Sequence, residues 1–77
     1  MTLIEDQTYQ PKILVIDDER RIRDGCSKIL LRENCLVDVA EDGDTGLKMI
    51  EEKHYDIILT DLMMPGVGGM EIVARVR

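Results

Sequence analysis

The sequence has few of the features that mark several common protein classes. It contains two cysteines and one histidine, and no apolar run approaches membrane-spanning length. Cys26 and Cys35 lack the close spacing and the accompanying histidine of a zinc site, so we expect reduced thiols rather than a disulfide. Residues 1–10 have neither the basic cluster nor the apolar core of a signal peptide. The sequence therefore predicts a cytoplasmic protein without membrane association.

Basic residues are also scarce relative to acidic ones. The chain has 10 Lys and Arg against 16 Asp and Glu, which gives a formal net charge of -6. Direct contact with nucleic acid requires a basic patch to neutralise phosphates, so we expect no nucleic-acid partner. With 44% hydrophobic and 34% charged residues, the composition is that of a soluble globular chain. At 77 residues it can form one small domain at most.

Short apolar runs alternate with segments of helical periodicity. After an irregular lead over residues 1–11, strands are expected at about 12–16, 37–40 and 56–60, each followed by a helix. This βαβαβα order predicts an α/β fold with a parallel sheet and flanking helices. The predicted inward stripes are Ile22, Cys26, Ile29 and Leu30, then Leu47 and Ile50, then Ile72, Val73 and Val76, with Arg20, Arg21, Arg23 and Lys28 facing outward.

Acidic residues stand where two of these strands end. Asp17 and Asp18 follow the first strand, and Asp61 follows the third, just before Met64 and Pro65. Placing the first strand between the other two, in the order 2-1-3, brings the three carboxylates together at the edge where such sheets bind ligands. At about 5 Å and an effective dielectric near 20, each pair would repel by roughly 3 kcal/mol. The pattern therefore predicts a cation, and specifically a Mg²⁺ site.

Three segments carry a family resemblance. Residues 13–19 (ILVIDDE), 40–43 (AEDG) and 60–69 (TDLMMPGVGG) resemble the amino-terminal part of the receiver domain of bacterial two-component response regulators. The resemblance covers residues 12–77, which would be the first three of five βα units in a flavodoxin-like (CheY-like) fold. No Gly-rich loop follows the first strand, so nucleotide binding is not expected.

The resemblance implies a role for each acid. Asp61 is similar to the residue that accepts a phosphoryl group from a sensor histidine kinase, which makes the chain a signalling module rather than an enzyme. Asp18 is similar to a direct Mg²⁺ ligand, and Asp17 to a ligand through water or an orienting residue. The backbone carbonyl of Met63 would be a further ligand. Glu19 is expected to be a first-turn acid of the helix and not a ligand.

The sequence departs from the family pattern in two respects. Gly68 stands where receivers often have Asp, Asn or Ser, although Gly at a helix start costs only a few tenths of a kcal/mol. Receivers also use a Ser or Thr after the fourth strand and a Lys after the fifth, and the chain stops before both. Thr60 is expected to be an ordinary strand residue and not a substitute for them.

Two other functions stay open from the sequence. One is a metal-dependent phosphohydrolase with an aspartyl nucleophile, although such enzymes commonly place nucleophile and acid two residues apart, a spacing that residues 17–19 lack. The other is a receiver-like interaction module that is never phosphorylated.

The carboxyl end of the sequence suggests an incomplete domain. The last helix stops at Arg77 without a Gly cap or a following breaker, and the third strand would be an apolar edge. We therefore expect a receiver domain truncated before strands 4 and 5, or one completed by another chain. The output domain or effector would lie outside this chain, and the open edge would favour self-association.

Overall fold

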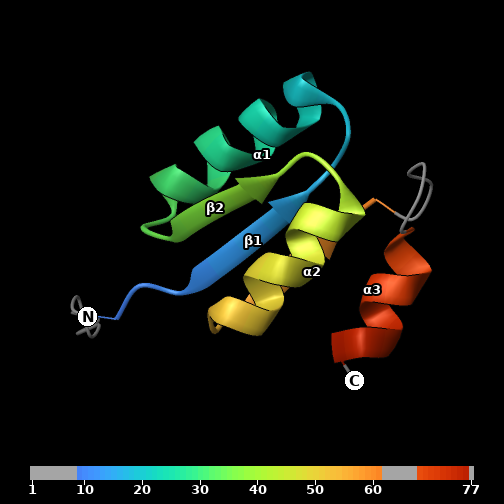
Figure 1. The fold of residues 1–77 in the computed structure, drawn as a ribbon. Coiled ribbons are helices and arrows are strands. Elements are labelled where there is room, and N and C mark those ends of the chain that lie inside the picture. The colour runs from blue at the N-terminus through green and yellow to red at the C-terminus, as the bar shows by residue number, and fades with distance from the viewer. Residues whose placement is uncertain (1–8, 62–67, 77) are drawn as a thin grey trace, which may run out of the picture.

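The sheet has the strand order that the sequence predicts. A computed structural model describes residues 9–61 and 68–76. Its elements are β1 (Lys12–Ile16), α1 (Arg20–Arg32), β2 (Leu36–Ala40), α2 (Gly43–Glu52), β3 (Ile57–Thr60) and α3 (Gly69–Val76) (Figure 1). The strands are parallel and ordered β2-β1-β3. The predicted α/β class, element order and strand order are confirmed.

The register of the sheet aligns the ends of its strands. Ile16, the last residue of β1, lies opposite Ala40 of β2 and Thr60 of β3. The residues that follow β1 and β3 therefore leave the sheet at one edge. This alignment is what places the acids after these two strands in the same region.

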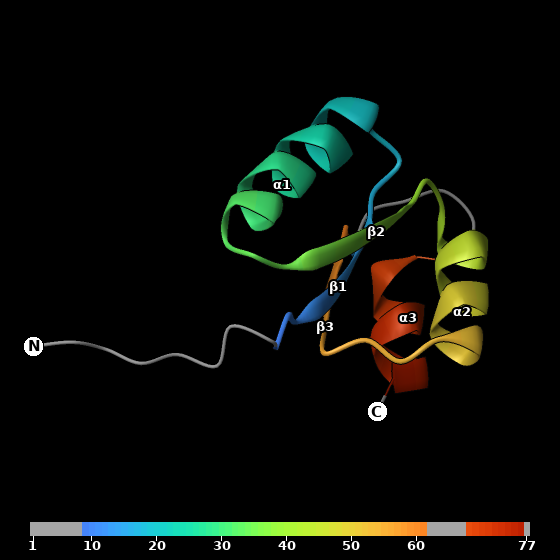
Figure 2. The ribbon, with the colours of Figure 1, turned by 90° about the vertical axis from the view of Figure 1, so that its left-hand side faces the viewer.

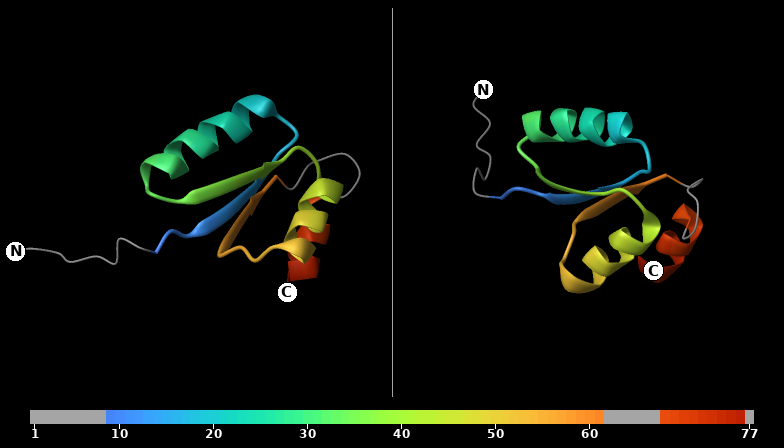
Figure 3. Two further views of the ribbon diagram at one scale, coloured as in Figure 1. Left: turned by 60° about the vertical axis from the view of Figure 1, so that its left-hand side comes forward. Right: turned by 45° about the horizontal axis from the view of Figure 1, so that its top comes forward.

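Helices cover both faces of the sheet, but unequally. α1 lies on one face, and α2 and α3 lie together on the other (Figures 2 and 3). The apolar run of β1 is buried on both faces, which explains why it shows no alternation. One core cluster lies under α2 and α3, and a second lies under α1. The first contains Leu14, Ile16, Ala40 and Ile72, and the second contains Ile13, Val15 and Cys35.

Only two of the four residues of α1 that were predicted to face inward pack against the sheet. Cys26 and Leu30 pack against the sheet, but Ile22 is 46% exposed and Ile29 is 63% exposed. The reason is that α1 packs over β2 and β1 and leaves β3 uncovered on this face. Arg23, predicted to face outward, is instead half-buried and donates a hydrogen bond to a backbone carbonyl.

A glycine lets α2 lie close to the end of β1. A Cβ on Gly46 would lie 2.5 Å from Cδ1 of Ile16, so no larger residue fits without movement. The helix begins after Asp42, whose Oδ1 accepts a hydrogen bond of 2.7 Å from the Thr45 N–H. Leu47 and Ile50 pack inward as predicted. This close approach places α2 against the end of β1, next to the edge of the sheet where the acids lie.

α3 closes the same face of the sheet. Ile72 is fully buried, as predicted, whereas Val73 is at the surface and the side chain of Val76 lies outside the described part. The carbonyl of Gly68 accepts hydrogen bonds from the N–H groups of Glu71 and Ile72, so the helix starts normally after this residue. In residues 9–61 and 68–76, no helix has the length and apolar character needed to cross a membrane.

Candidate metal centre

Asp17 is held firmly where β1 ends. Its N–H donates to the carbonyl of Ala40 at 3.1 Å, which ties it to β2. Its Oδ1 accepts from the N–H of Glu19 at 2.9 Å, and Glu19 is the residue that caps α1. Glu19 makes no side-chain capping bond of its own. The carboxylate of Asp17 therefore contributes one of the hydrogen bonds that hold the turn from β1 into α1.

Asp61 occupies the equivalent place after β3. Its N–H donates to the carbonyl of Ile16 at 3.0 Å, so its backbone lies beside the end of β1. Its side chain is half-buried. The hydroxyl of Thr60 donates to the Asp61 carbonyl at 3.2 Å, a local contact that matches the expected role of a strand residue.

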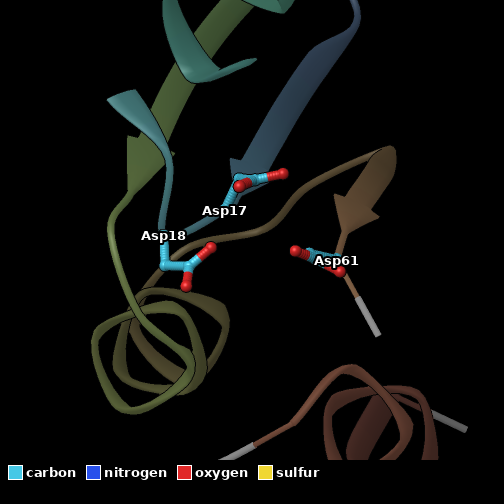
Figure 4. Close-up of side chains that lie close together, drawn as sticks. All are labelled: Asp17, Asp18 and Asp61. Carbon is cyan, nitrogen blue, oxygen red and sulfur yellow. The ribbon is translucent and has the colours of Figure 1, made fainter. Parts of the chain in front are cut away.

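The acids converge as the strand order predicts. One carboxylate oxygen from each of Asp17, Asp18 and Asp61 lies within 4.8 Å of the other two. In Figure 4 the Asp61 side chain, after β3, points back toward Asp18, after β1. Asp18 is exposed, whereas Asp17 and Asp61 are half-buried. The structure thus brings together three of the four sequence-predicted ligands, and their role as ligands stays a prediction.

The donor set suits Mg²⁺. Hard carboxylate oxygens are its preferred protein ligands, and it retains several waters, which an open site allows. Within residues 9–61 and 68–76, no salt bridge joins Asp17 or Asp18 to a basic side chain. At the observed spacing, each pair of carboxylates repels by about 1 to 3 kcal/mol, depending on how far water screens it. A divalent cation would remove that repulsion.

One predicted ligand cannot be placed. Met63 lies outside the described residues, as do Met64 and Pro65. The contribution of the Met63 carbonyl therefore stays a prediction.

An open hollow borders Asp61 on the face of the sheet that α1 covers. Its volume is about 510 Å³. Both acidic and apolar residues line it: Val15, Ile16, Asp17, Glu19, Ile22, Cys26, Leu59, Thr60 and Asp61. Asp61 is therefore reachable from solvent. That Ile22 and Cys26 line this hollow could not be predicted, because their helical periodicity indicates only packing against the sheet.

A family model decides the classification. The model of the response regulator receiver domain matches residues 13–77. The chain belongs to this family. Its α/β sheet is therefore that of a receiver domain, a type of signalling module, and the resemblance drawn from the sequence is confirmed.

Curated relatives of this receiver domain include transcriptional regulators. The chain is 50% identical over 72 residues to the transcriptional regulatory protein ResD of Bacillus subtilis, covering 94% of this chain and 30% of that protein. It is 37% identical over 67 residues to the transcriptional regulatory protein AfsQ1 of Streptomyces coelicolor, covering 87% and 30%. The chain thus spans about 30% of the length of these relatives.

Solved structures support the same fold. The response regulator TrrA of Thermotoga maritima, in complex with Mg(2+)-BeF, has a TM-score of 0.85 and 37% identity. The match covers 88% of this chain and 59% of that one. The chemotaxis protein CheY4 of Vibrio cholerae has a TM-score of 0.84 and 33% identity, covering 90% and 57%. The CheY-like fold of the receiver domain is therefore shown.

Proposed function

We propose that this receiver domain accepts a phosphoryl group on Asp61 from a sensor histidine kinase, with Mg²⁺ held by Asp17, Asp18 and Asp61. The observation that carries the proposal is the convergence of three carboxylate oxygens within 4.8 Å beside a solvent-accessible acceptor. The similar Thermotoga structure, a complex with Mg(2+)-BeF, supports the choice of metal.

Asp17 and Asp18 supply the charge that holds the cation. The position of Asp17 is set by its bonds to Ala40 and Glu19, so this ligand needs little rearrangement when the ion binds. When bound, Mg²⁺ supplies positive charge that offsets the negative oxygens of the acceptor and of the incoming phosphoryl group. Asp17 also orients the first turn of α1 through Glu19.

Asp61 is the nucleophile. One carboxylate oxygen forms a bond to phosphorus while the bond from phosphorus to the kinase histidine nitrogen breaks, and that nitrogen keeps the electron pair. The product is an acyl phosphate on Asp61 and a free imidazole. A carboxylate is a modest nucleophile, so the domain contributes mainly by positioning Asp61 and by keeping the acceptor open to the hollow.

The wider role follows from the family. A kinase that carries phosphohistidine would be the upstream partner, and an output domain or effector outside this chain would receive the conformational signal. This role also implies a cytoplasmic location. Both partners are proposals, because the chain spans about 30% of its curated relatives.

Phosphorylation with a small donor tests the acceptor. The intact gene product, incubated with acetyl phosphate and Mg²⁺, should gain one phosphoryl group that hydroxylamine removes, because acyl phosphates react with hydroxylamine. Intact-protein mass spectrometry with peptide mapping measures both properties. The mapped site should be Asp61.

Two variants make this test specific. Asp61→Asn should abolish the incorporation, whereas Asp44→Asn, at an exposed acid in the first turn of α2, should leave it unchanged. Undiminished incorporation in Asp61→Asn would show that the acceptor is elsewhere. Absence of incorporation in the unchanged protein would favour a receiver-like interaction module.

A further inference from the structure

Arg23 is the basic residue of α1 that the structure places differently from its neighbours. Arg20 and Arg21 are exposed, and Arg20 pairs with Asp24 on the helix surface at 3.6 Å. Arg23 is half-buried, and its Nη1 donates to the backbone carbonyl of Asp17 at 2.7 Å. A guanidinium that contacts the backbone of an aspartate would be expected to pair with a carboxylate. Within the described residues it forms no salt bridge and binds a main-chain oxygen instead.

That oxygen belongs to the peptide group between the first two acids. The N–H of Asp17 is fixed by the carbonyl of Ala40, and its carboxylate by the N–H of Glu19. The bond from Arg23 fixes the carbonyl, so the plane of the peptide that joins Asp17 to Asp18 is held. Of these three bonds, only the one from Arg23 has a side-chain donor, which a substitution removes without changing the backbone.

We propose that Arg23 is a positioning residue for the metal centre, acting through the Asp17 carbonyl to hold the peptide that carries Asp17 and Asp18. The inference rests on the proposed Mg²⁺ site and goes beyond it by assigning a residue that supports the ligands. Partners that orient metal ligands typically change affinity by about 10-fold to 100-fold when removed. A bond from a charged donor is stronger than one between neutral groups, which suits it to this task.

The charge of Arg23 and its hydrogen bond should have opposite effects on the affinity for Mg²⁺. A positive charge near the site opposes cation binding, so its removal alone should strengthen Mg²⁺ binding. Loss of the hydrogen bond to the Asp17 carbonyl should weaken it. We expect the loss of the hydrogen bond to have the larger effect on Mg²⁺ affinity.

Calorimetric titration of the intact chain with Mg²⁺ separates these effects. Arg23→Met keeps most of the side-chain length but removes the donors, and we expect its Kd to rise by about 10-fold. Arg23→Lys retains the charge and one donor group, so its Kd should lie between those of Arg23→Met and the unchanged chain. Arg21→Met removes the same charge from an exposed position of the same helix and should change the Kd by less than about twofold.

The outcomes are distinct. Equal or tighter binding by Arg23→Met overturns the proposal, and if that variant does not fold, equal binding by Arg23→Lys does so. Absence of binding by the unchanged chain overturns the proposed site itself, and this inference with it. A second readout needs no metal: the N–H of Glu19, which donates to Asp17, should exchange faster in Arg23→Met than in Arg21→Met. Equal exchange would also contradict the positioning role.

Discussion

The two faces of the sheet are built from similar residues but are covered differently. On the face under α2 and α3, Leu14 is 0% exposed, and Ile16, Ala40 and Ile72 are buried with it. On the opposite face α1 packs over β2 and β1, and Leu59 of β3 is 42% exposed. The exposed fraction of a strand residue therefore depends on which helix lies over it, and not on its hydrophobicity.

The same difference applies to the three acids of the candidate metal centre. Asp17 and Asp18 follow β1, which is sealed on both faces, whereas Asp61 follows β3, which is an edge strand of the described sheet with one face half-open. The two acids after β1 therefore form the fixed side of the site. The exposed Ile57 and Leu59 agree with the expected self-association through β3, which stays a prediction.

Two leucines on opposite faces provide the test with the largest expected effect. Leu14→Ala should lower the free energy of unfolding by about 3 to 4 kcal/mol, because it leaves a cavity in the closed core. Leu59→Ala, the matched change in β3, should cost about 1 kcal/mol, because the side chain is already partly in water. Urea denaturation measures both. Equal losses would show that the two faces are equally well packed.

The helix glycines give the next largest contrast. Gly46→Ala should destabilise by about 1 to 3 kcal/mol, since its Cβ would meet Ile16 on the closed face. Gly25→Ala, in α1, meets nothing within 4 Å and should stabilise by up to about 1 kcal/mol through helix propensity. Thermal unfolding of both variants checks the signs. A stabilised Gly46→Ala would mean that α2 can move away from β1 at little cost.

A smaller effect is expected at the other end of the α2 and α3 face. The hydroxyl of Tyr55 donates to Oδ2 of Asp38 at 2.6 Å, and this bond is the main cause that lowers the pKa of Asp38 below 3.8. Burial, followed by the same bond, raises the pKa of Tyr55. Tyr55→Phe should cost about 1 kcal/mol at pH 7, because Asp38 is partly screened by water.

The lowered pKa of Asp38 fixes the sign of the pH dependence. The stabilisation is present above pH 3.8 and is lost as the pH falls through the lower folded-state value. Unfolding measured at pH 7 and below pH 3.8 should therefore show a smaller loss on acidification for Tyr55→Phe than for the unchanged chain. An identical loss in both would mean that this bond does not stabilise the fold.

Much of the fold follows from local pattern. The apolar runs and the helical periods predicted the element order, and the need to bring Asp17 and Asp61 together predicted the strand order. The orientation of α1 could not be predicted in this way, because it depends on which strands the helix covers. Ile22 and Ile29 share the periodicity of Leu30, yet they lie where the sheet leaves α1 without a partner.

The candidate site shows the same limit. Three acids at strand ends are visible in the sequence, because parallel strands share a carboxyl edge. The contact of Arg23 is not visible in the sequence, because its partner is a backbone carbonyl, and every residue has one. The reason for a glycine at position 46, inside α2, is likewise the close approach of Ile16, which no local pattern indicates. Side-chain contacts to the backbone and close approaches between helices and strands become visible only in the three-dimensional structure.

The most direct test of the proposed Mg²⁺ site is the free energy of unfolding of the chain with and without Mg²⁺. At about 100 times its Kd, Mg²⁺ bound only by the folded state should stabilise the chain by about 2.7 kcal/mol. Asp18→Ala and Asp61→Asn should each remove most of this gain, whereas Asp44→Asn should keep it, because Asp44 lies in the first turn of α2 and is not one of the three clustered acids. Equal unfolding midpoints with and without Mg²⁺ in the folded, unchanged chain would contradict a shared site of Asp17, Asp18 and Asp61.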